Sequence, residues 1–218
     1  IHYTGMPNEK KAINKLTDIK SKVSCHYFIK KNGKVILMVP ELYVAWHAGI
    51  SNWKNFESIN KFSIGIEVQN RGHAHGYHKF SMAQINSLIY LCSKLIKKYK
   101  IQNRNVLAHS DISYNRKIDP GEKFPWKILY KNKIGLWHNL NNKKLISLRG
   151  KPVSFKELTL FMKNLIKFGY SYKSISIKNK LKNKKILIKA FQRRFRPELI
   201  NGIIDRECLL ISQNLIKS

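Results

Sequence analysis

The stretch SIGIEV at residues 63–68, with the stretch SMAQINSLIYLCSKLIKKYK at residues 81–100, decides the fold class. The first is a compact apolar run, which is typical of a buried strand. In the second, Ser81 and Gln84 form a capping box, and apolar residues from Ile85 to Ile96 recur at helical spacing, so a helix is predicted. A buried strand and a long amphipathic helix together favour an α/β fold.

The flanking segments extend this pattern. Strands are predicted at residues 1–3, 23–29, 35–39 and 106–108, and a helix at residues 9–19. Asn32-Gly33 predicts a two-residue hairpin turn, because both positions of such a turn must tolerate positive φ. A long polar loop then runs from Ala108 to Pro125, and long ordered loops are usually functional. We therefore expect a mixed central β-sheet flanked by helices.

The composition of the chain changes after Trp137, because residues 139–144 are mostly polar and charged. Ser154 and Glu157 form a second capping box, whose helix should end at Gly169. A further helix is predicted at residues 184–195, and a third is capped by Asp205. These signals predict one large domain at residues 1–138, a linker at 139–150 and a small three-helix bundle at 151–218.

The composition excludes several classes of protein. The formal charge of +30 attracts polyanions, but the lysines are spread along the whole chain and no nucleic-acid-binding motif is present, so no nucleic-acid partner is expected. The charge is either a solvated surface or an attraction to a carboxylate-rich cell-wall polymer. No stretch approaches the roughly 20 apolar residues of a membrane span. The three scattered cysteines favour neither disulfides nor a cysteine zinc site. We also expect the protein to be a monomer.

Three residues could hold a metal ion. His109 and Asp119 lie ten residues apart around one loop, and His2 lies on the opening strand. Two imidazoles and one carboxylate, with an open fourth position, are a ligand set of catalytic zinc. The alternatives are an ordinary strand histidine for His2 and a loop-stabilising hydrogen bond for His109 and Asp119.

Two charged residues accompany this set. Glu67 lies on an otherwise apolar strand, where an acidic side chain needs either a charged partner or a functional role. Lys117 is two residues from Asp119 and can reach the same cavity without being a ligand. Glu67 could instead pair with a lysine as a structural ion pair, and Lys117 could be a solvated loop residue.

Six motifs in order resemble the type-2 amidase family, which includes bacterial muramoyl-alanine amidases and animal peptidoglycan-recognition proteins. They are IHYT (1–4), VSCHY (23–27), AWHAG (45–49), SIGIE (63–67), AHSDI (108–112) and RKIDPG (116–121). AFQRRFRP (190–197) and NGIID (201–205) also resemble a peptidoglycan-binding helical module. The combination is similar to the envelope amidases of Gram-negative bacteria.

The resemblance implies roles for individual residues. It makes His2, His109 and Asp119 the ligands of one zinc ion per chain, Glu67 the general base and Lys117 the cation that stabilises the oxyanion. The implied reaction is hydrolysis of the amide between N-acetylmuramic acid, or its anhydro form, and L-alanine of the peptidoglycan stem peptide. Trp46 and His47 are expected to contact the substrate, whereas His26 is expected to be a buried, hydrogen-bonded histidine.

The main alternative is a peptidoglycan-recognition protein that binds without cutting. All three ligand positions and both catalytic positions are filled, which favours the enzyme. The expected location is the cell envelope or periplasm, or outside the cell, with the cytoplasm as the alternative. Because Ile1 opens inside an expected strand, a segment upstream of it is also expected.

Overall fold

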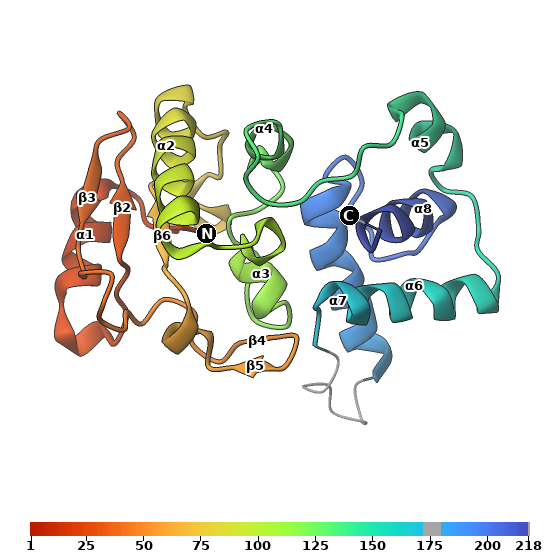
Figure 1. The fold of residues 1–218 in the computed structure, drawn as a ribbon, viewed down its shortest axis with the longest axis horizontal. Helices are drawn as coiled ribbons and strands as arrows, with labels where there is room; N and C mark the ends of the chain where they lie inside the picture. The colour runs from red at the N-terminus through yellow and green to blue at the C-terminus, as the bar shows by residue number, and fades with distance from the viewer. Residues whose placement is uncertain (172–179, 218) are drawn as a thin grey trace.

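The computed structural model describes residues 1–171 and 180–217 and contains a mixed sheet, as predicted (Figure 1). Its strands are β1 (His2–Tyr3), β2 (Tyr27–Ile29), β3 (Val35–Leu37) and β6 (Ile66–Val68), in the order β1-β6-β2-β3. β1, β6 and β2 are parallel, and β3 is antiparallel to β2. A separate small hairpin consists of β4 (Asn52–Trp53) and β5 (Phe56–Glu57).

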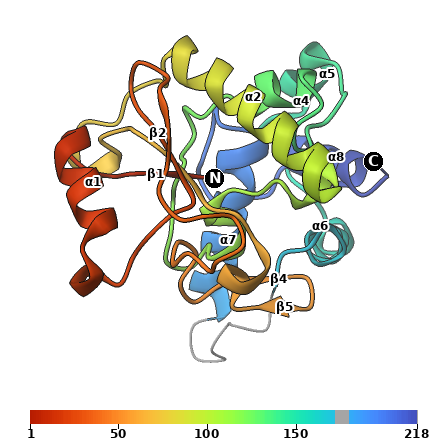
Figure 2. The same cartoon turned by 60° about the vertical axis from the view of Figure 1, so that its left-hand side comes forward.

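Helices α1 (Glu9–Thr17) and α2 (Met82–Tyr99) lie on opposite sides of the sheet (Figure 2). Side chains alternate between the two faces of a strand, so neighbouring residues of β2 enter different cores. Phe28 packs with Ala12 of α1 in a small separate cluster, whereas Ile29 joins the main core with Leu88 of α2. The predicted capping box of Ser81 and Gln84 is confirmed.

The β2–β3 hairpin is confirmed, but its turn differs from the prediction. The Lys30 amide donates to the Lys34 carbonyl over 2.9 Å, which closes a three-residue loop. Within that loop only Gly33 has a positive φ, of 87°. This is a three-residue connection with glycine in the left-handed region, and not the predicted two-residue turn.

Two predicted strands also differ from the structure. Strand β2 begins at Tyr27 and not at Val23, because the Ser24 amide donates to the Trp46 carbonyl instead of to a neighbouring strand. Residues 106–108 form no strand. The Leu107 carbonyl accepts from the Ile1 amino group, but the Val106 carbonyl accepts from Arg194, so no strand ladder forms. The chain then enters the short helix α3 (His109–Ile112), because the Asp111 carboxylate accepts a hydrogen bond from the Ala108 amide.

The C-terminal part is helical, as predicted. It contains α5 (Asn142–Leu148), α6 (Phe155–Phe168), α7 (Lys180–Phe195) and α8 (Arg206–Leu215). The caps at Ser154, Gly169 and Asp205 are confirmed. Figure 1 shows these helices on the side of the molecule away from α1, with α3 and α4 (Trp126–Lys131) between. Within the described residues, none of the helices has the length and apolar character of a membrane span.

The boundaries of the predicted domains stay a prediction. Residues 139–150, predicted as a linker, contain α5, and its Leu145 is buried in a core that also contains Ile29 and Phe161. The main core is therefore continuous from the sheet to the C-terminal helices. The predicted domain at 151–218 includes residues 172–179 and 218, which lie outside the described residues.

A buried polar cluster joins the two parts. Arg194 of α7 forms an ion pair with Asp111 of α3, and its Nη2 donates to the Val106 carbonyl over 2.9 Å. The Tyr170 hydroxyl donates to Asp111 Oδ1 over 2.7 Å. The Arg194 guanidinium also lies 4.2 Å from the centre of the Trp126 ring. The C-terminal helices are thus attached to the segment that carries His109.

Replacing Arg194 by methionine should destabilise the fold strongly. The side chain is 1% exposed and its partner Asp111 is fully buried, so the variant leaves a buried carboxylate without its cation. Such losses typically cost about 3–5 kcal/mol. Urea unfolding followed by circular dichroism measures this. Arg206→Met is the matched control, because Arg206 is exposed and its side chain donates a long hydrogen bond, of 3.4 Å, to the Pro152 carbonyl. Equal urea midpoints for the two variants would contradict a stabilising role for the Arg194–Asp111 ion pair.

Candidate metal centre

Strand pairing places two of the predicted site residues side by side. In the parallel pairing of β1 with β6, His2 lies opposite Glu67, and Glu67 also lies opposite Phe28 of β2. Register partners point to the same face of a sheet. His2 and Glu67 therefore share the face on which Phe28 packs against α1.

The loop after α3 brings the other two ligand candidates to His2. The His109 amide donates to the Ile1 carbonyl over 3.1 Å, which fixes the start of α3 beside β1. The Ser110 amide donates to the Asp119 carbonyl over 2.9 Å and closes the loop on itself. As a result, residues 2, 109 and 119 meet although they lie far apart in the sequence.

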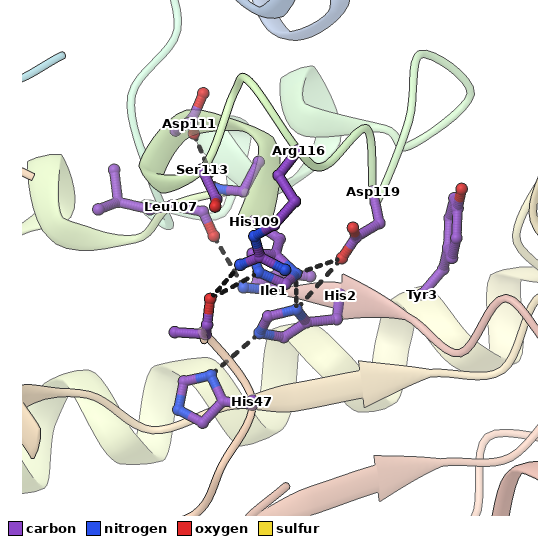
Figure 3. A network of polar contacts seen from close by, with 12 residues as sticks. Ile1, His2, Tyr3, His47, Leu107, His109, Asp111, Ser113, Arg116 and Asp119 are labelled. Atoms are coloured by element: carbon purple, nitrogen blue, oxygen red, sulfur yellow. Dashed lines mark hydrogen bonds and ion pairs between the residues drawn. The ribbon is translucent and has the colours of Figure 1, made fainter. Parts of the chain in front are cut away.

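The three side chains form a tight triangle (Figure 3). His2 Nδ1 lies 2.8 Å from His109 Nδ1 and 3.2 Å from Asp119 Oδ2, and His109 Nδ1 lies 3.1 Å from the same oxygen. All three residues are buried. Atoms bound to one zinc ion at about 2.0–2.1 Å in tetrahedral geometry lie about 3.3 Å apart. The observed triangle fits such an ion closely.

The protonation of these groups also suits a metal ion. His109 Nε2 lies 3.0 Å from the Ala48 carbonyl oxygen, which can only accept, so Nε2 carries the proton and Nδ1 has a free lone pair. Burial, followed by the neighbouring His109, holds the pKa of His2 well below its usual value. Burial opposes the charge of Asp119, but the two imidazoles outweigh it and lower the pKa of that carboxyl. Neutral imidazoles and an ionised carboxylate are the forms that bind metals.

Glu67 and Lys117 line one cleft of about 320 Å³ with His109 and Asp119. Burial, and then the charge of Asp119, raise the pKa of Glu67 to about 8. Its Oε2 has no hydrogen-bond partner among the described residues. A buried carboxylate oxygen without a hydrogen-bond partner lowers the stability of the fold. Such an atom is typical of a group whose partner is a bound substrate or water. The structure brings the five predicted residues together, and their roles stay a prediction.

Trp46, His47 and His26 differ in exposure and in their hydrogen bonds, and the rings of the two histidines lie 5.7 Å apart. Trp46 is half exposed and lines the cleft. His47 is buried, and burial lowers its pKa to about 3. His26 is buried and hydrogen-bonded, as predicted: Nδ1 accepts from the Gly65 amide and Nε2 donates to the Tyr43 carbonyl.

Sequence reasoning missed two basic residues that line the cleft, Lys15 and Arg116. Arg116 Nη2 donates to the carbonyls of Ala48 and Ile50 over 2.8 and 3.1 Å. Its position directly before Lys117 was the available signal. Lys15 is three residues from the buried Ala12, so its place on the inner face of α1 could have been read from helical spacing.

Comparisons with known proteins agree with this geometry. Residues 1–122 match the family Amidase_2, described as N-acetylmuramoyl-L-alanine amidase. Over 100% of its length the chain is 35% identical to N-acetylmuramoyl-L-alanine amidase AmiD of Escherichia coli K12, covering 81% of that protein. It is 40% identical to 1,6-anhydro-N-acetylmuramyl-L-alanine amidase AmpD of Haemophilus influenzae over 107 residues, which are 49% of this chain and 56% of that protein.

A solved structure covers almost the whole chain. It is the complex of E. coli AmiD with the substrate anhydro-N-acetylmuramic acid-L-Ala-D-gamma-Glu-L-Lys, at a TM-score of 0.83 and 36% identity, covering 99% of this chain and 86% of that one. Sequence, fold and the arrangement of His2, His109 and Asp119 lead to one family. This chain belongs to the N-acetylmuramoyl-L-alanine amidases of the Amidase_2 family.

Proposed function

We propose that this protein uses one zinc ion to hydrolyse the amide between N-acetylmuramic acid, or its anhydro form, and L-alanine of the stem peptide. The observation that carries the proposal is the convergence of three ligand atoms, all within 4.8 Å of one another, at a cleft that Glu67 lines together with His109 and Asp119. The solved relative bound to an anhydro-muramoyl peptide supports the substrate class. All five site residues come from a single chain, which supports a monomer as the working form.

His2, His109 and Asp119 would hold the zinc ion. A zinc ion in such a site supplies Lewis acidity to the amide carbonyl and to the attacking water. The cleft supplies the remaining groups. Glu67 accepts the proton of the attacking water and passes it to the departing amine, because its raised pKa lies near the pH at which it must do both. The Lys117 ammonium offsets the negative charge that develops on the carbonyl oxygen, a contribution of about 3 kcal/mol in comparable sites.

The non-catalytic alternative is a recognition protein that binds the same polymer. It requires neither an acid at Glu67 nor a cation at Lys117, yet both residues line the cleft with His109 and Asp119. This arrangement favours the enzyme.

We further propose that the enzyme works on the cell wall in the envelope, with residues 151–218 helping to hold the polymer. The match to AmiD extends over the whole chain, including the C-terminal helices, whereas the match to AmpD covers 49% of it. The cytoplasm is the alternative location.

Removing a ligand should remove the metal. His109→Ala or Asp119→Ala leaves two ligands of the triangle, so purified protein should contain much less than the one zinc ion per chain expected of the native protein. Elemental analysis after dialysis measures the content. His75→Ala is the matched control, because His75 is exposed and lies outside the triangle. Full zinc occupancy in the His109 or Asp119 variant would remove that residue from the ligand set.

Replacing Glu67 by glutamine should separate binding from chemistry. The amide keeps the shape of the side chain but cannot take a proton, so zinc should remain while turnover of a soluble anhydro-muropeptide falls about 10²-fold or more. Glu122→Gln is the control, because Glu122 pairs with His73 outside the ligand triangle. Near-native turnover in the Glu67 variant would refute its role as the base.

The charge of +30 should affect wall binding more than hydrolysis. Attractions between exposed charges are screened over about 8 Å at physiological ionic strength, so capture on insoluble peptidoglycan should fall as salt rises. Hydrolysis of a small soluble muropeptide depends on contacts within the cleft and should change far less. Parallel sedimentation and hydrolysis assays measure both, and two flat curves would show that the lysines do not guide binding.

A further inference from the structure

Both histidine ligands must meet a metal ion through the same ring atom. In the triangle, His2 and His109 each present Nδ1 to Asp119 Oδ2. Only an unprotonated nitrogen can bind a metal, so a neutral imidazole that uses Nδ1 must carry its proton on Nε2. The partner of each Nε2 therefore decides whether the ligand is in the tautomer that binds.

For His109 that partner is a backbone carbonyl. Nε2 lies 3.0 Å from the Ala48 oxygen, and a carbonyl oxygen accepts but cannot donate. The proton of His109 is therefore held on Nε2. The same carbonyl also accepts from Arg116 Nη2 over 2.8 Å, which helps to fix its direction.

For His2 the partner is another histidine. His2 Nε2 lies 3.1 Å from His47 Nδ1, and between two neutral imidazoles either one can donate. The direction is decided at the far side of His47. There the Ser63 hydroxyl lies 2.7 Å from the Ile59 carbonyl oxygen, to which it must donate.

Ser63 Oγ, having donated its only proton, accepts from His47 Nε2 over 3.3 Å. His47 then carries its proton on Nε2 and has a free lone pair on Nδ1. That lone pair accepts from His2 Nε2–H, which leaves His2 Nδ1 free for the metal. Ser63, His47 and His2 thus form a directed relay that starts at a backbone carbonyl.

The segment that carries both partners is held rigidly. Asn60 Oδ1 accepts from the amides of both His47 and Ala48, over 3.1 and 2.7 Å. The His47 ring lies directly against Gly65, the residue before β6: a Cβ at this position would come within 2.2 Å of His47 Cγ. Glycine at position 65 is therefore a condition for this position of the ring.

We propose that the His47–Ala48 segment sets the tautomers of both histidine ligands, with His47 as the positioning residue for His2 and Ser63 as the residue that orients His47. This deepens the proposed zinc site and rests on it. Hydrogen bonds of this kind to the second nitrogen of a ligating histidine typically change metal affinity by about 10–100-fold.

Zinc affinity tests the proposal, measured by competition with a chromophoric chelator. His47→Leu should weaken zinc binding about 10–100-fold, whereas His47→Asn, which can still offer an acceptor to His2, should weaken it less. The matched control is His138→Leu, because His138 is 7% exposed against 9% for His47 and its ring packs on Trp137, away from the ligand triangle. The control should bind zinc with near-native affinity.

A spectroscopic readout separates positioning from packing. Long-range proton–nitrogen NMR spectra of the native protein should show His2 and His47 protonated on Nε2. In Ser63→Ala the His47 ring loses the acceptor of its Nε2 proton, so the proton of His47 should redistribute between the two nitrogens and zinc binding should weaken. This variant also carries the test if His47→Leu does not fold.

Three results would overturn the proposal. They are native zinc affinity in His47→Leu, an equal loss in His138→Leu, and unchanged spectra together with unchanged affinity in Ser63→Ala. A native protein that fails to bind zinc would instead contradict the proposed function, so the two failures are distinguishable.

Discussion

The parallel pairing of β1 with β6 is the constraint on which the geometry of the candidate site depends. It places His2 opposite Glu67 on one face of the sheet, so the candidate ligand and the candidate base are fixed relative to one another by backbone hydrogen bonds. Ile1 extends the same constraint to the neighbouring loop, because its carbonyl accepts from the His109 amide. A slip of one residue would turn both side chains to the opposite face, and the triangle could not form.

A second constraint acts through Asp111. Its carboxylate accepts from the Ala108 amide, from the Tyr170 hydroxyl and from Arg194. A buried charge is stable only when it is paired and hydrogen-bonded, so three separate segments must be in place before α3 is correctly formed. The C-terminal helices therefore contribute to the segment that presents His109, whatever further contact they make with the wall.

Local signals in the sequence were the most reliable. The capping boxes at Ser81 and Ser154 and the glycine after α6 depend on neighbouring residues, and all three are confirmed. Residues 106–108 were misread as a strand because their backbone groups bond to Ile1, Asp111 and Arg194, which belong to separate segments and not to one neighbouring strand. The ligand set was found from the order of the family motifs. The relay through Ser63 could not be found, because its direction depends on a hydroxyl that contacts the Ile59 carbonyl.

The division of the apolar interior into two clusters bears on how a polymer reaches the cleft. Helix α1, which forms one wall through Lys15 and Leu16, packs on the small cluster of Ala12, Cys25 and Phe28 and not on the main core. Segments with few buried contacts open locally at lower free energy than the whole domain unfolds. The wall formed by α1 should therefore open at a lower free energy than the main core, which would give a bulky peptidoglycan strand room to enter the cleft.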